Sequence, residues 1–226
     1  MISAPAVRVG LRRSIGLAAS TFALGVTFGA IARGHGWGLA APIVASILVF
    51  SGSAQFALVT TLAGGGGAWA AVASAALINL RFFPMALSIA PALHGGRIRH
   101  AIEAQTVVDG SWVLAHQDED RFDRGVLFGS ALAQWPAWVI GTILGVLLAP
   151  SPKLIEATGL DVVFPAFFTL LLLDEVRLAR LSLAVAAASA VITALLLLAV
   201  PAGPALLGGG AAALIGLRQA RNGRSC

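Results

Sequence analysis

The stretch that decides the fold is residues 68–93, AWAAVASAALINLRFFPMALSIAPAL. It is almost entirely apolar, and it is long enough for a helix that crosses a bilayer, which needs about 20 residues. Arg81 lies near its centre. Because a charged side chain at that depth costs from about 3 to more than 10 kcal/mol, we expect Arg81 to face the protein interior or a water-filled cavity.

Two residues beside Arg81 indicate that this helix is interrupted. Pro84 removes a backbone hydrogen bond and disfavours helix at the preceding residue. A plain proline kink would not account for Asn79 and Arg81 beside it. We therefore expect a break within residues 79–84. Arg81 there either clamps an anionic group, such as a substrate carboxylate, or pairs structurally with an acid or free carbonyls.

The rest of the chain has the same apolar character. Of its 226 residues 58% are hydrophobic and 11% are charged, against about 25% charged residues in soluble domains. This composition excludes a disordered chain, a nucleic-acid-binding domain and a soluble enzyme with a charged surface. We expect an all-α polytopic integral membrane protein, with residues 1–226 forming a single transmembrane permease domain that has short basic tails.

Eight apolar runs are candidate membrane spans. The first imitates a signal peptide, but its apolar stretch continues too far, so we expect an uncleaved span. The fourth is the least apolar and either crosses as a polar helix or lies at the interface, which gives seven or eight transmembrane helices. The runs are residues 14–31, 39–63, 68–93, 97–116, 125–148, 160–173, 181–200 and 204–217.

Basic clusters at the ends of these runs predict the orientation. Placing the first cluster and the last three on the cytoplasmic side requires an even number of crossings, which favours eight over seven. Arg97 and Arg99 would then lie on the outer side and break the rule once. The clusters are Arg8/Arg12/Arg13, Arg97/Arg99, Arg121/Arg124, Arg177/Arg180 and Arg218/Arg221/Arg224.

The second run also contains polar residues, in the patch FSGSAQF at residues 50–56. Small polar residues and Gly52 permit an unwound backbone, which a membrane tolerates only where it lines a cavity or is buried in protein. The half-helix that follows would expose N–H groups that attract carboxylates. Close helix packing through Ser53 and Gly52 is the alternative. Gln55 favours a functional site, because a large amide near the midplane needs partners.

Asp109 is the acid best placed to enter the helix bundle. It could accept the ammonium group of an amino acid, pair with Arg81 or carry a coupling proton, or it could be an exposed acid on an interfacial segment. Glu103 is a weaker candidate of the same kind. Asp161 begins its run where a helix N-cap would stand.

Other kinds of site lack a signature in this sequence. The four histidines share no metal-ligand spacing, and Gly64 to Gly67 lacks the Lys-Ser/Thr of a phosphate-binding loop. We expect no metal, no cofactor and no enzymatic activity. Cys226 is the only cysteine, so an intramolecular disulfide is excluded.

The polar patches together resemble the AzlC family of branched-chain amino-acid exporters. The resemblance depends mainly on Gly-Ser-Ala-Gln-Phe at residues 52–56 and Asn-Leu-Arg at residues 79–81. Weaker similarity extends to Thr106-Val-Val-Asp109 and to residues 160–167. It implies a bacterial inner-membrane permease that exports branched-chain amino acids, together with a separate small membrane subunit of the AzlD type.

Two positions depart from the family pattern. Phe82 stands where the family often has histidine, and Gly110 stands where it often has glutamate. Both missing side chains are candidate proton-handling groups, so the energy coupling and the exact substrate stay open.

We therefore expect a secondary transporter that binds an aliphatic zwitterion between two spans broken near the midplane. Its carboxylate would meet Arg81 and the N–H groups of residues 52–55, and its ammonium Asp109 or carbonyls near Asn79. Phe56, Phe82 and Phe83 could wall its side chain. The predicted substrate-binding residues are Gly52, Ser53, Gln55, Asn79, Arg81 and Asp109.

Two alternatives stay open. The chain could be a non-transporting membrane subunit that organises a complex through Gly25/Gly29 and Gly141/Gly145, with Arg81 and Asp109 as a structural pair. It could also be a passive channel for a small solute.

Overall fold

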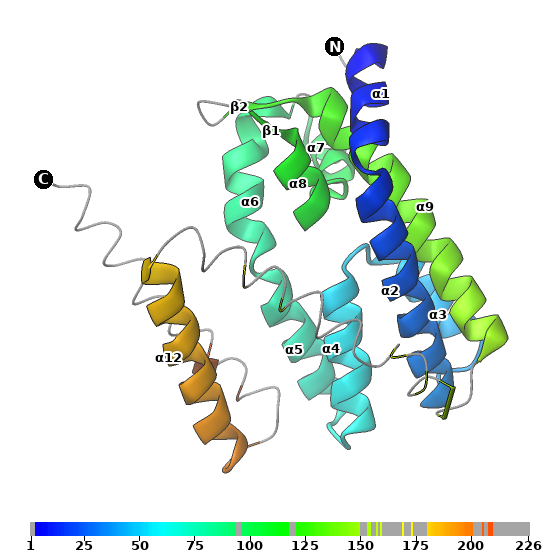
Figure 1. Cartoon of the computed structure of the whole chain (residues 1–226), viewed down its shortest axis with the longest axis vertical. Coiled ribbons are helices and arrows are strands. Elements are labelled where there is room, and N and C mark those ends of the chain that lie inside the picture. Colours follow the sequence, from blue (N-terminus) through cyan, green and yellow to red (C-terminus); the bar gives the residue numbers. More distant parts are fainter. Residues whose placement is uncertain are drawn as a thin grey trace, which may run out of the picture. The chain divides into compact units, whose positions relative to one another are not determined.

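The computed structural model describes residues 3–93, 96–117, 121–149 and 180–200, and the separate positions 153–154, 157, 159, 169, 173, 205 and 208–209. The expected spans at 160–173 and 204–217, and the expected cap Asp161, lie largely or wholly outside the described residues. Figure 1 shows that helices dominate. The elements are α1 Ala4–Arg13, α2 Ile15–Gly34, α3 Ala40–Leu48, α4 Gly52–Ala63, α5 Ala68–Asn79, α6 Phe82–Ile89, η1 Ala90–Ala92, α7 Arg97–Ala104, α8 Asp109–Ala115, β1 His116–Gln117, β2 Arg121–Phe122, α9 Arg124–Leu148 and α12 Arg180–Leu197.

The chain divides into two compact units. Unit 1 consists of Met1–Phe56 and Ile78–Leu160, and unit 2 consists of Ala57–Leu77 and Asp161–Cys226. All six predicted substrate-binding residues belong to unit 1. In unit 2, Ser189 Oγ on α12 donates a hydrogen bond to the carbonyl oxygen of Gly209 (2.9 Å).

Three helical segments among the described residues are long and apolar enough to cross a membrane: Ile15–Gly34, Ala68–Ala92 and Arg124–Leu148. They correspond to the first, third and fifth of the expected spans. Part of the seventh forms a shorter apolar helix, Leu183–Leu197. The described chain is thus a largely helical protein with the composition of a membrane protein.

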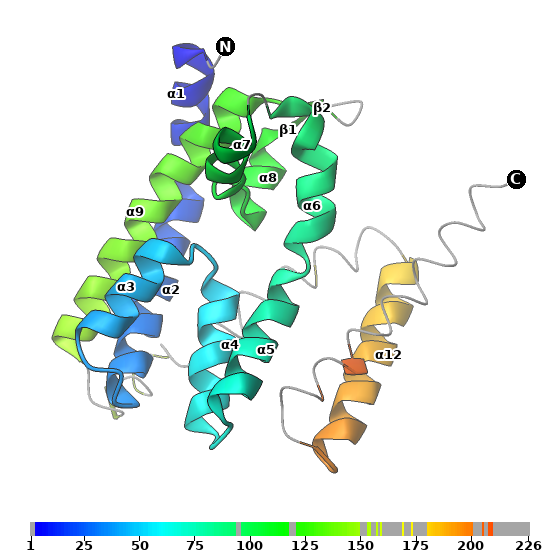
Figure 2. The same ribbon diagram turned by 180° about the vertical axis from the view of Figure 1, so that it is seen from behind.

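Helices α2 and α9 form the centre of unit 1 and lie side by side in Figures 1 and 2. Their contact is made by Gly25 and Gly29 on α2 and by Gly141 and Gly145 on α9. A Cβ atom at any of these glycines would overlap backbone atoms of the facing helix. The two small-residue pairs therefore pack against each other within the chain, which is the geometry that small-xxx-small spacing allows.

An aromatic cluster packs between this helix pair and α4. The ring of Phe28 stacks on that of Trp138, with centroids 5.9 Å apart, and meets Phe56 edge-on at 5.8 Å. Phe28, Trp138 and Phe56 are all at most 3% exposed. The ring of Phe56 thus fixes the start of α4 in the core, and it is not among the residues that line the cavity described below.

The N-terminal segment forms a helix of its own, α1, which was not expected. Ser14 joins it to α2, and its buried hydroxyl donates to the carbonyl oxygen of Gly10 (2.8 Å). Gly10 lies against the backbone of Val126, so α1 packs on the beginning of α9. The basic cluster of α1 is consequently at the same end of unit 1 as the start of α9.

Residues 97–116 form two short helices, α7 and α8, of 8 and 7 residues. Neither reaches the length that a bilayer span requires. Ser111 Oγ stabilises the turn between them, because it accepts from the N–H of Val108 (3.0 Å) and donates to the carbonyl oxygen of Thr106 (2.5 Å). The described residues between α8 and α9 include the small antiparallel pair β1 and β2.

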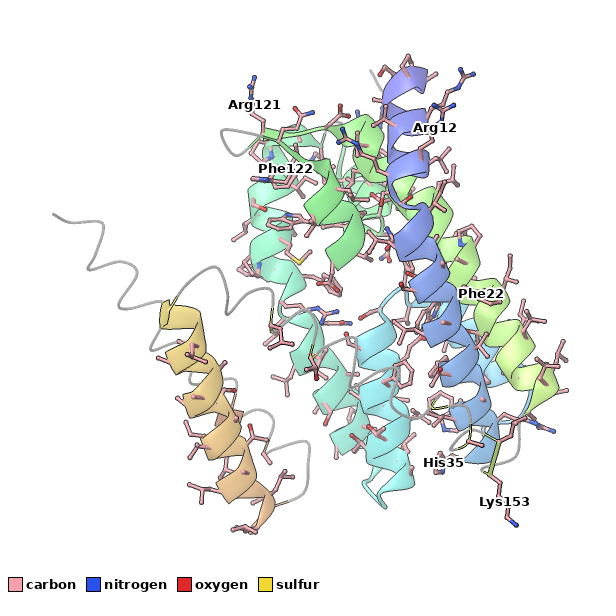
Figure 3. All side chains as sticks on the ribbon, in the orientation of Figure 1. Arg12, Phe22, His35, Arg121, Phe122 and Lys153 are labelled. Carbon is pink, nitrogen blue, oxygen red and sulfur yellow. The ribbon has the colours of Figure 1, made fainter. Side chains whose placement is uncertain are left out.

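The structure corrects the predicted position of Arg97 and Arg99. Glu103 is 4% exposed, and its carboxylate pairs with Arg99 Nε (2.8 Å) and with Arg124 Nη2. Arg99 and Arg124 cannot pair with one carboxylate from opposite faces of a bilayer about 30 Å thick. Figure 3 also shows Arg12 and Arg121 at the same end of the unit. Arg97 and Arg99 therefore lie on the same side as the first basic cluster, and they are no longer an exception to the positive-inside rule.

Candidate functional site

Two helix interruptions meet in unit 1. Helix α3 ends at Leu48 and α4 begins at Gly52, while α5 ends at Asn79 and α6 begins at Phe82. Figure 2 shows the chain turning sharply between α3 and α4. The Oγ of Ser51 donates to Oδ1 of Asn79 (2.6 Å), so a hydrogen bond joins the two interruptions directly.

The position of Pro84 explains where the second interruption falls. Pro84 is the third residue of α6, where the first turn of a helix has no intrahelical use for a backbone N–H. In the middle of a continuous helix the same ring would clash with the preceding turn. The helix therefore restarts just before the proline, and Leu80 and Arg81 form the turn.

Arg81 connects three segments. Its Nη2 atom donates to Oγ of Ser53 at the start of α4 and to Oδ2 of Asp109, the first residue of α8, at 2.8 Å each. The guanidinium carbon lies 5.0 Å from the centre of the Phe82 ring, in cation–π geometry. The Arg81 and Asp109 side chains are 31% and 45% exposed. A charged, partly accessible pair thus occupies the helix break.

A cavity of about 380 Å³ lies within unit 1, and Phe82 and Val108, the chain neighbours of Arg81 and Asp109, line it. Its wall is mostly apolar, and Ser51 and Asn79 contribute polar groups. Phe82 lines it, whereas Phe83 is 67% exposed and is not part of the wall. The complete lining is Leu48, Val49, Phe50, Ser51, Asn79, Phe82, Ala86, Ala104, Gln105, Val107 and Val108.

Gln55 is turned away from Arg81 and into the protein. Its Nε2 donates to the carbonyl oxygen of Val49 (2.7 Å), one of the acceptors that the end of α3 leaves free. Its Oε1 accepts from Trp138 Nε1 (3.0 Å) and from Ser46 Oγ (3.4 Å). With only 4% of Gln55 exposed, the structure favours a role in holding the helix break over direct substrate contact.

Ser46, Trp138 and Thr142 complete this network and were missed by sequence reasoning. Trp138 Nε1 lies 3.1 Å from Ser46 Oγ, which in turn lies 2.9 Å from Thr142 Oγ1. All three are at most 3% exposed. The available signal was the four-residue spacing of Trp138 and Thr142, which places both on one face of a helix.

Two glycines allow close approaches beside the site. A Cβ atom at Gly52 would lie 2.8 Å from the Trp138 ring, and one at Gly110 would lie 2.6 Å from Oε1 of Gln134. Gly52 therefore lets α4 begin directly against α9. At position 110, Gln134 occupies the space that a side chain would need.

The geometry thus brings together four of the six predicted residues, namely Ser53, Asn79, Arg81 and Asp109, with Ser51 added. Gly52 and Gln55 lie close to Ser53 in the chain, but they face α9 instead of Arg81. Such an arrangement can hold a carboxylate at Arg81 and a cationic group at Asp109. Within the described part of the chain, no three His, Cys, Asp or Glu side chains are grouped so as to hold a metal ion.

Comparison with known proteins identifies the family to which the chain belongs. The family model described as AzlC protein matches residues 16–151, more than half of the chain. The protein is therefore a member of the AzlC family.

The relatives are membrane proteins. An uncharacterized membrane protein of Archaeoglobus fulgidus is 27% identical, with 75% of this chain and 76% of the relative covered. The inner membrane protein YgaZ of Escherichia coli is 24% identical, with coverages of 73% and 71%. No solved structure matches the chain.

Proposed function

We propose that the protein is a secondary transporter that exports branched-chain or related small aliphatic amino acids. The observation that carries the proposal is Arg81, which occupies a helix break beside an apolar cavity and is hydrogen-bonded to Ser53 and Asp109. Ionisable residues inside transmembrane segments commonly mark substrate pathways. Broken helices that meet near the middle of a bundle are a recurrent binding arrangement in transporters.

An aliphatic amino acid fits this chemistry. Its carboxylate would bind the Arg81 guanidinium and the Ser53 hydroxyl, at the N-terminus of α4. Its ammonium group would approach Asp109 or the carbonyl groups around Asn79. Its side chain would enter the cavity of about 380 Å³, whose wall includes Phe82, Ala86 and Val107. Gln55 and Gly52 would keep the start of α4 in position.

The proposal extends to the cellular setting. The name of the Escherichia coli relative, an inner membrane protein, supports a bacterial inner membrane as the location. A separate small membrane subunit of the AzlD type and coupling to a proton gradient belong to the same proposal. The proposal includes neither nucleic-acid binding nor enzymatic activity.

Efflux from cells tests the proposal. Cells that express Arg81→Ala should lose leucine and valine efflux, and Arg81→Lys should lose most of it, because an ammonium group cannot replace the planar guanidinium fork. Arg33→Ala, at an exposed position near the end of α2, is the matched control and should be normal. Normal efflux from both Arg81 variants at normal protein levels would refute the clamp.

The alternative of a non-transporting subunit predicts a different outcome. Under that alternative, replacing Arg81 by Met together with Asp109 by Leu should be tolerated, because an ion pair with only a structural role can be replaced by apolar groups of similar size. The structure already uses both glycine pairs between α2 and α9, so those surfaces are not available to a partner. A passive channel would show flux that a protonophore does not change.

A further inference from the structure

The charge of Arg81 is neutralised within the chain by Asp109. Arg81 Nη2 and Asp109 Oδ2 are 2.8 Å apart, and they come from segments 28 residues apart in the sequence. The Ser53 hydroxyl shares the same Nη2 atom at 2.8 Å, but it is neutral and cannot replace either charge. Both N–H groups of this atom are engaged, so a ligand anion that takes the position of Asp109 on Arg81 must displace that carboxylate.

The charge of the ligand decides what the displacement costs. A monoanion on Arg81 leaves the Asp109 carboxylate without its cation and beside a second negative charge, which is unfavourable in a partly buried site. A monocation on Asp109 leaves the Arg81 guanidinium without its anion and beside a second positive charge. A zwitterion with both charges on neighbouring atoms replaces one ion pair by two, so neither side chain loses its partner.

From this geometry we infer that Asp109 makes the site selective for zwitterions. It acts as a specificity-determining residue that rejects 2-hydroxy acids and simple amines with the same carbon skeleton, which the cavity alone would admit. This inference rests on the proposed function, because it concerns the ligand of the same site. Selection against a competitor through an uncompensated charge is a general route to specificity.

Competition binding tests the inference. Radiolabelled L-leucine is bound to the purified full-length chain and displaced by unlabelled L-leucine, 2-hydroxy-4-methylpentanoate or 3-methylbutylamine at neutral pH. Both single-charge analogues should be weaker competitors than leucine by about 100-fold or more, as expected when charged groups of a site are left unpaired. Equal displacement by leucine and the hydroxy acid would overturn the inference while leaving amino-acid binding intact.

Variants of Asp109 provide the second arm. In Asp109→Asn the preference for leucine over the hydroxy acid should fall to about tenfold or less, since the monoanion no longer meets a carboxylate. Asp109→Glu should retain the wild-type preference. Asp123→Asn, at the N-cap of α9, is the control for a lost carboxylate elsewhere and should also retain it.

The outcomes separate the two proposals. Direct binding of labelled 2-hydroxy-4-methylpentanoate, with melting temperature as a check of folding, keeps Asp109→Asn informative if it binds little leucine. An unchanged preference in Asp109→Asn would refute zwitterion selection. Absence of leucine binding by the wild-type chain would instead refute the proposed function, and the inference with it.

Discussion

Gln55 shows how strongly one side chain can depend on partners that are distant in the sequence. Its amide joins the end of α3 to Trp138, which is 83 residues away along the chain. Sequence reasoning identified Gln55 as a buried amide that needs partners. It assigned those partners to a substrate, because nothing in residues 50–56 indicates that α9 lies against them.

Replacing Gln55 by Met tests this role. The variant removes the amide that links the Val49 carbonyl to the Trp138 N–H. Both groups keep a second partner, Ser51 N–H and Ser46 Oγ, so each lost hydrogen bond costs about 0.5–1.5 kcal/mol. We expect a clearly lower melting temperature for Gln55→Met in purified protein, and an unchanged one for Ser20→Ala, which removes an exposed hydroxyl. A variant with wild-type stability and no leucine binding would instead make Gln55 a substrate contact.

Glu103 holds the basic end of unit 1 together. In Glu103→Gln the Arg124 guanidinium, 12% exposed, loses its carboxylate, and breaking a buried ion pair costs about 3–5 kcal/mol. The partner Arg99 is 60% exposed, so Arg99→Ala should cost less than about 1 kcal/mol. Thermal unfolding of both variants measures the difference. Similar melting temperatures for the two would contradict the buried character of the Glu103–Arg124 pair.

At the scale of elements, the positions of the helix breaks were predictable from local chemistry. Pro84 and the Ser-Gly-Ser patch at residues 51–53 each disfavour continuous helix, although Pro136 lies inside α9 without ending it. The short helices α7 and α8 were not predicted, because the apolar content of residues 97–116 is also that of a weak span. The contact between α2 and α9 was predictable only in part. The spacing of Gly25/Gly29 and Gly141/Gly145 indicates two faces suited to close packing, but it does not show that these faces meet each other.

A pair of glycine substitutions on α2 tests that contact. A Cβ at Gly29 would overlap the backbone of Thr142, so Gly29→Ala should destabilise the protein by about 1–3 kcal/mol. Nothing lies within 4 Å of the corresponding position at Gly16, so Gly16→Ala should be neutral or stabilising by up to about 1 kcal/mol. Melting temperatures that shift in the same direction by the same amount would contradict the close packing of α2 on α9.

At the scale of the whole molecule, the shared carboxylate of Glu103 constrains topology. Arg99, Arg124 and the basic cluster of α1 lie at one end of unit 1, so an even number of crossings separates Arg13 from Arg97. If α2 and Ala68–Ala92 each cross the membrane once, the segment formed by α3 and α4 must begin and end on the same side of the membrane. This differs from the expected crossing at residues 39–63.

Cysteine accessibility tests this topology. With the natural Cys226 replaced by Ser, single cysteines are introduced at Gly34, Gly67 and Arg99, and intact cells are treated with a membrane-impermeant maleimide. Gly34→Cys and Gly67→Cys should give the same labelling result, and Arg99→Cys the opposite one. Opposite results at positions 34 and 67 would show that α3 and α4 cross the membrane.

The central claim is that Arg81 holds the carboxylate of a transported amino acid. Flux of radiolabelled leucine into proteoliposomes tests it most directly, with the full-length chain reconstituted with and without a small AzlD-type subunit. We predict transport by the wild-type protein and a loss of about 100-fold or more in Arg81→Ala. Equal flux through the wild-type and Arg81→Ala proteins would contradict the account.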